Sequence, residues 1–180
     1  MRKYRMPELT DYRAIVSRFH SLLALVLMVI VFSIFADGFL SVDNFWTVMR
    51  QISVNICLSV GMTLVILTGG IDLSVGSILA LSGAIMAGLL KSGTEIPAFD
   101  LYIGYQAPAA IVIGILAGAS LGLFNGVMIT RFKVPPFIAT LAMLTIARGL
   151  TKLYTGGEAI TNLGDAFVSI GSGRWLGIPN

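Results

Sequence analysis

Long apolar stretches decide what this chain can fold into. Unsatisfied backbone polar groups are costly in hydrocarbon, so a segment that crosses a bilayer forms a helix of roughly 17 to 25 mostly apolar residues. The sequence is 56% hydrophobic and only 12% charged, with a mean hydropathy of +0.90. We therefore predict an all-α fold, a polytopic transmembrane helix bundle of about five spans, at about 19–36, 52–69, 73–90, 107–130 and 137–153.

Basic residues predict how these helices are oriented. Lys and Arg residues cluster before the first apolar stretch, and in short loops such residues concentrate on the cytoplasmic side. We expect residues 1–18 to be a basic cytoplasmic segment and residues 19–153 to be the transmembrane bundle. Residues 154–180, which are rich in Gly and Asn, are expected to be an external loop or interfacial segment.

The stretch TGGIDLSVGS places one acid between two apolar stretches that otherwise carry no charge. An ionisable residue at membrane depth costs roughly 2.5 to 3.5 kcal/mol on insertion scales, and it tends to mark a pathway or a buried pair. If both stretches are complete helices, Asp72 lies in their short cytoplasmic turn and caps the next helix. If they are parts of a broken helix that dips into the bilayer, Asp72 faces a cavity. Gly69, Gly70 and Ser74 suit either a capped turn or a mobile gate for a hydroxylated substrate.

Other polar positions in the apolar stretches are further candidates for a solute path. Gln51, Asn55 and Ser59 are spaced four apart along one face of the second predicted helix. Their alternative role is hydrogen bonding to neighbouring helices. The candidates for the substrate pathway or gate are therefore Asp72, Ser74, Gly69, Gly70, Gln51, Asn55 and Thr140.

Small residues recur at intervals of four in the third and fourth predicted helices. A face of small residues lets two helices approach closely in lipid, where van der Waals packing must drive association. A face that slides during transport is the alternative. The predicted helix-packing positions are Gly76, Ala80, Ala84, Gly88, Gly114, Gly118, Gly122 and Gly126.

No pattern in the sequence indicates an enzyme or a bound cofactor. The single histidine, His20, is juxtamembrane, and Cys57 is the single cysteine, so no catalytic triad, metal site or disulfide framework is indicated. No phosphate-binding loop pattern is present, so we do not expect the chain to bind ATP by itself. The basic residues bear on membrane topology, and we predict no nucleic-acid partner.

Two longer motifs carry a family resemblance. LTGGIDLSVGSILALSGAIMAGLL and RFKVPPFIATLAMLTIARGLTKLYTGG, with LFNGVMI between them, closely resemble the permease subunits of bacterial ABC importers for monosaccharides of the ribose, xylose and galactose type. Asp72 matches the family's GGIDLS motif. Pro135, Pro136, Thr140 and Arg148 match its second motif, and the resemblance assigns none of these residues an individual role.

The resemblance implies an integral, multi-pass subunit of the bacterial inner membrane that works by alternating access. Its implied partners are a cytoplasmic ABC ATPase, a periplasmic sugar-binding protein, and a second permease copy that forms a dimer around the translocation path. Members of this family are usually near twice this length. We therefore expect a fragment, a truncated copy or half of a split permease, which does not transport by itself.

Three other functions stay open from the sequence. The same architecture could import another small polar solute. A secondary carrier would use Asp72 as a proton or sodium site. A structural membrane protein built on the glycine faces would carry no solute at all.

Overall fold

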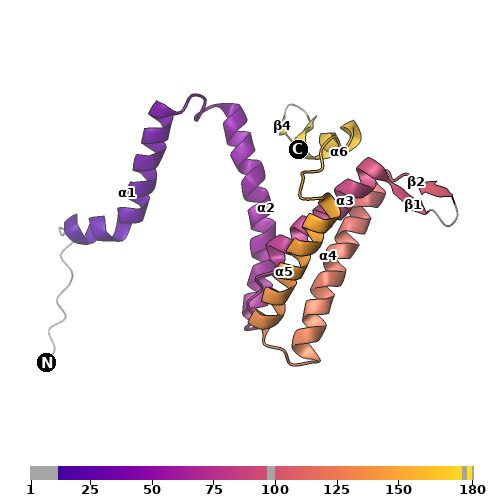
Figure 1. Ribbon diagram of the computed structural model, residues 1–180. Coiled ribbons are helices and arrows are strands. Elements are labelled where there is room, and N and C mark those ends of the chain that lie inside the picture. The colour runs from indigo at the N-terminus through magenta and orange to yellow at the C-terminus, as the bar shows by residue number, and fades with distance from the viewer. Residues whose placement is uncertain (1–11, 97–99, 176–177, 180) are drawn as a thin grey trace. The chain divides into compact units, whose positions relative to one another are not determined.

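The computed structural model describes residues 12–96, 100–175 and 178–179 of the chain, and these residues are largely helical (Figure 1). Two short antiparallel strand pairs join β1 to β2 and β3 to β4. The predicted all-α class is confirmed. The elements are α1 (Tyr12–Phe35), α2 (Val42–Leu67), α3 (Val75–Ser92), β1 (Thr94–Ile96), β2 (Leu101–Ile103), α4 (Ala107–Thr130), α5 (Pro136–Thr155), α6 (Asp165–Ser172), β3 (Arg174–Trp175) and β4 (Ile178–Pro179).

Four of the described helices, α2 to α5, are long and apolar enough to cross a membrane by length and composition. The described apolar part of α1, Phe19–Phe35, is somewhat shorter. The predicted stretch 107–130 coincides with α4, whereas α2 starts at Val42 rather than near residue 52. The first turns of α2 carry polar residues, which hydropathy does not register as part of a span. Residues 1–11 of the predicted basic segment lie outside the described residues. The orientation of the helices stays a prediction.

The chain divides into two compact units, residues 1–53 and 54–180, and the boundary falls within α2. In the first unit, a turn joins α1 to α2. The rings of Phe32 and Phe39 stack there with their centroids 5.8 Å apart. The Asn44 side chain donates a hydrogen bond to the Phe39 carbonyl oxygen at 2.7 Å, which fixes the start of α2 against the turn.

In the second unit, α2 ends in a hydrogen-bonded glycine turn. Gly69 adopts a left-handed conformation with φ of 75°. Its N–H donates to the Ile66 carbonyl at 2.9 Å, and the Gly70 N–H donates to the Val65 carbonyl at 3.1 Å. This pair of bonds is the Schellman motif, which stops a helix and favours glycine at the left-handed position. Consequently, α2 and α3 are separate helices joined by a non-helical junction at 68–74.

The second unit is organised around α3, which packs against both α4 and α5, whereas α4 and α5 contact each other less extensively (Figure 1). Leu81, Met143 and Ala147 form its small buried core. By contrast, α2 has no buried residue. Apolar helix surfaces left exposed within one chain are the surfaces that lipid or other membrane helices cover.

Candidate functional site

A buried polar cluster joins the α2–α3 junction to α4. One oxygen of Asp72, Oδ1, accepts hydrogen bonds from the Ser74 N–H at 2.7 Å and from the Ser74 hydroxyl at 2.6 Å. The same hydroxyl oxygen accepts a hydrogen bond from Asn125 Nδ2 at 3.0 Å. Ser74 is fully buried and Asn125 is 5% exposed. The aspartate turn that precedes α3 is therefore tied to α4 through side chains alone.

The junction is also tied to α5. Thr140 is 2% exposed, and its hydroxyl lies 3.1 Å from the Ile71 carbonyl oxygen and 2.8 Å from the Pro136 carbonyl oxygen. The Phe137 carbonyl oxygen lies 3.4 Å away. A hydroxyl has one hydrogen to donate, so these three carbonyls share it. Among the described residues, no buried side-chain nitrogen or oxygen lacks a hydrogen-bond partner. Both neighbouring helices thus hold the junction in place.

The polar cluster is inset from the ends of α4 and α5. Asn125 lies five residues before α4 ends at Thr130, and Thr140 lies four residues after α5 begins at Pro136. At a rise of 1.5 Å per residue, the cluster is roughly 6 to 8 Å inside the turn that joins these two helices. That turn carries Arg131, which is exposed. The junction is a non-helical segment between two helices that are each long and apolar enough to cross a membrane, and its depth in the bilayer stays a prediction.

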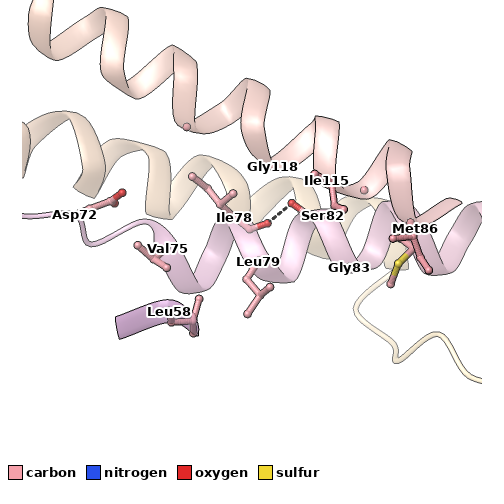
Figure 2. Close-up of a pocket in the computed structure, with 13 residues that line it drawn as sticks. Leu58, Asp72, Val75, Ile78, Leu79, Ser82, Gly83, Met86, Ile115 and Gly118 are labelled. Atoms are coloured by element: carbon pink, nitrogen blue, oxygen red, sulfur yellow. Dashed lines mark hydrogen bonds between the residues drawn. The ribbon is translucent and has the colours of Figure 1, made fainter. Parts of the chain in front are cut away.

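A groove of about 470 Å³ runs along α3 and α4 and is bordered by Leu58 of α2. Figure 2 shows Asp72 at one end of the row of lining residues and Met86 at the other. Asp72 and Ser82 are the polar side chains in a lining that is otherwise apolar or glycine. The Ser82 hydroxyl donates to the Ile78 carbonyl oxygen at 2.7 Å, so its hydrogen is already used.

Three of the predicted packing glycines lie at close helix contacts. A Cβ atom at Gly114 would lie 3.1 Å from Met86 Cβ and 3.2 Å from the Ser82 carbonyl oxygen. At Gly118 it would lie 2.8 Å from the Ser82 hydroxyl oxygen. At Gly88 it would lie 2.7 Å from the ring of Tyr154 on α5. These glycines allow α3 to approach α4 on one side and α5 on the other.

The other predicted packing residues of α3 and α4 do not lie at close contacts between helices. No atom lies within 4 Å of a Cβ atom built at Gly76, Gly122 or Gly126. Gly122 lines the groove. Ala80 is exposed and Ala84 is half-buried.

The other candidate residues take places outside the polar cluster. Asn55 is exposed on α2, where its carbonyl oxygen accepts a hydrogen bond from Ser59 at 2.7 Å. Gln51 is exposed in the first unit. The three remaining residues of the second family motif all lie at or in α5. Pro136 is the first residue of this helix, a position that suits proline, and Pro135 immediately precedes it. Arg148 is exposed on the surface of α5.

Sequence reasoning missed the part that Asn125 takes in this cluster. The signal for this role was available, because Asn125 is the one amide side chain in the strongly apolar α4. The described residues contain no group of three or more His, Cys, Asp or Glu side chains that could hold a metal ion.

Comparisons with known proteins place these features in a family context. The family model described as the branched-chain amino acid transport system permease component matches residues 44–173. The ribose import permease protein of Bacillus subtilis (strain 168) is 45% identical over 159 residues, which cover 87% of this chain and 46% of the relative. The corresponding ribose protein of Escherichia coli (strain K12) is 40% identical over 163 residues, 88% of this chain and 47% of the relative.

A third relative carries a different solute in its name. The autoinducer 2 import system permease protein of Escherichia coli (strain K12 / DH10B) is 34% identical over 158 residues, which cover 88% of this chain and 43% of the relative. The chain spans about half the length of the curated relatives it matches. No solved structure gives a significant match.

Proposed function

The chain belongs to this family of transport permease components, and from that premise we propose that it forms part of the permease of an ATP-driven sugar importer. It is a multi-pass, all-α protein of the inner membrane. The observation that carries the proposal is the 45% identity to a ribose import permease over 87% of the chain. Ribose is accordingly the first substrate to test, and the autoinducer 2 relative makes another small polar solute the second candidate.

The proposed partners follow from the ABC architecture. A cytoplasmic ATPase supplies the energy, a periplasmic sugar-binding protein delivers the substrate, and a second permease copy completes the path by dimerisation. The sequence contains no phosphate-binding loop pattern, and in this proposal the ATPase partner hydrolyses ATP. The permease itself opens the translocation path alternately to the two sides of the bilayer.

Within this chain, we propose that the groove along α3 and α4 belongs to the translocation path. A carboxylate at membrane depth is costly unless it faces a polar partner or a hydrated cavity. Asp72 lines the groove, and Gly122 leaves the adjoining surface of α4 open. Ser74 and Thr140 then act as supports of the junction, and the exposed Gln51 and Asn55 face other helices of the assembly.

The test is sugar uptake by cells. The 180-residue chain is joined to the part of the Bacillus subtilis ribose permease that follows its matched region, and the fusion is expressed in a strain that lacks its own ribose permease. We expect uptake of labelled ribose that disappears when the ribose ATPase gene is deleted. Uptake that persists without the ATPase and follows a proton or sodium gradient would instead establish a secondary carrier.

A further inference from the structure

The two oxygens of the Asp72 carboxylate have different surroundings. Oδ1 accepts two hydrogen bonds from Ser74, at 2.6 and 2.7 Å. The second oxygen, Oδ2, has no hydrogen-bond partner among the described residues. Asp72 is half-buried and lines the end of the groove that lies nearest the α2–α3 junction (Figure 2). One half of this side chain is therefore committed to the fold, and the other half is available as a hydrogen-bond acceptor.

Two successive hydrogen bonds, from Asn125 to Ser74 and from Ser74 to Asp72, orient the carboxylate. The Asn125 amide group donates to the Ser74 hydroxyl oxygen at 3.0 Å. Because that amide nitrogen is a donor only, the single Ser74 hydroxyl hydrogen points to Asp72. Thr140 holds the carbonyl of Ile71, the residue immediately before Asp72. The carboxylate is thus positioned from α4 and from α5 at once.

The groove fits a small solute with both polar and apolar surface. Its volume of about 470 Å³ lies within the range of roughly 300 to 1,000 Å³ typical of small-molecule sites. The wall formed by Val75, Ile78 and Ile115 is apolar, which suits the C–H faces of a sugar ring, whereas Asp72 offers a charged acceptor at one end. A sugar presents many hydroxyl donors, and hydrogen bonds to a charged group are stronger than neutral ones.

We propose that Asp72 accepts a hydrogen bond from a hydroxyl group of the transported sugar, and that Ser74 and Asn125 are positioning residues that aim its carboxylate into the groove. This inference rests on the proposed function. It adds a specific contact within the permease, so that the permease itself discriminates hydroxylated solutes during translocation. A role confined to capping the junction would make no such contact.

Asp72→Asn separates these two roles. An asparagine keeps a side-chain oxygen that accepts both hydrogen bonds from Ser74, so the junction is retained. Its second group becomes an amide, which donates and cannot accept from a hydroxyl. We expect the KM of ribose uptake by the fusion protein to rise roughly 10- to 100-fold, the effect of losing a charge-assisted hydrogen bond. Asp37→Asn, which removes an exposed acid that does not line the groove, is the matched control and should leave KM unchanged.

The positioning role has its own signature. Asn125→Ala removes the donor that orients Ser74 without touching the carboxylate. We expect a smaller rise in KM, with the maximal rate per membrane-inserted molecule retained. A purely structural role would lower the amount of inserted protein and leave KM unchanged, which contradicts the inference for this residue.

A second pair of variants keeps the inference testable if Asp72→Asn is poorly inserted. Gly83 and Gly149 both lie in helices where an added Cβ atom meets nothing within 4 Å. Gly83 lines the groove, whereas Gly149 does not. Gly83→Leu should abolish ribose uptake and Gly149→Leu should retain it.

The outcomes distinguish the two proposals. If the unmodified fusion imports no ribose or other solute of its relatives, the proposed function fails. If the unmodified fusion imports ribose while Asp72→Asn keeps its KM, or while Gly83→Leu imports as well as Gly149→Leu, the proposed function survives and the contact at Asp72 is refuted.

Discussion

Four glycines of α4 recur every four residues, but they lie in two different environments; this glycine row consists of Gly114, Gly118, Gly122 and Gly126. Gly114 and Gly118 lie so close to α3 that a single added carbon would touch Met86 or Ser82. Gly122 and Gly126, one and two turns further along, have no atom within 4 Å of an added carbon. Gly114, Gly118 and Gly122 all line the groove along α3 and α4, and of these three Gly122 alone leaves space for an added carbon. Regular spacing therefore identifies a helix face, whereas the separation of the two helices decides whether a glycine on that face touches its neighbour or has free space beside it.

The largest loss of stability should come from adding a side chain at Gly114, where α3 and α4 are in close contact. Gly114→Leu must displace Met86 Cβ and the Ser82 carbonyl, and both are fixed by the backbone of α3. Overpacking of this kind costs about 1–3 kcal/mol of unfolding free energy. Gly126→Leu adds the same side chain where space is open, and its effect should stay within about 0.5 kcal/mol. Thermal unfolding of the purified chain in detergent, followed by circular dichroism, compares the two. Equal losses of stability would remove the distinction between the halves.

A smaller effect should separate two threonines that differ in the same way. Thr140 is buried and joins α5 to the junction through the Ile71 carbonyl, whereas the exposed Thr130 bonds only the Gly126 carbonyl of its own helix. Valine has nearly the shape of threonine but no donor. We expect Thr140→Val to lower the unfolding free energy by about 1 kcal/mol and Thr130→Val to leave it nearly unchanged. The same unfolding measurement applies, and a loss at Thr130 as large as at Thr140 would show that the bond to Ile71 contributes nothing.

The helical architecture could be predicted because hydropathy reports directly on the segments that suit hydrocarbon. The starts of helices could not be predicted equally well. The first turns of α2 carry Asp43, Asn44 and Arg50, so their helical state depends on local capping and on the chain that follows rather than on hydropathy. Gly69 and Gly70 were predictable as a turn because glycine suits the left-handed conformation that ends a helix.

The polar cluster could be predicted only in part. Asp72 and Ser74 stand out as polar residues between apolar stretches, and their mutual bond is local in sequence. Their contact with Asn125 joins residues 51 positions apart, and the contact of Thr140 with Ile71 joins residues 69 positions apart. Such pairings depend on how α4 and α5 pack against α3, and spacing within one helix does not encode this packing. The polar stripe of α2 illustrates the converse, since Asn55 and Ser59 share a face and remain exposed.

The central claim is that the groove beside Gly122 borders a solute path rather than lipid. It is tested most directly by thiol labelling in membranes. With the exposed natural cysteine replaced (Cys57→Ser), Gly122→Cys places a thiol in the groove, and Leu123→Cys places one on the 70% exposed surface beside it. We predict that a water-soluble thiol reagent labels the cysteine at position 122 rapidly, that ribose slows this labelling, and that position 123 is labelled slowly. Equal and ribose-independent labelling of the two positions would contradict the account.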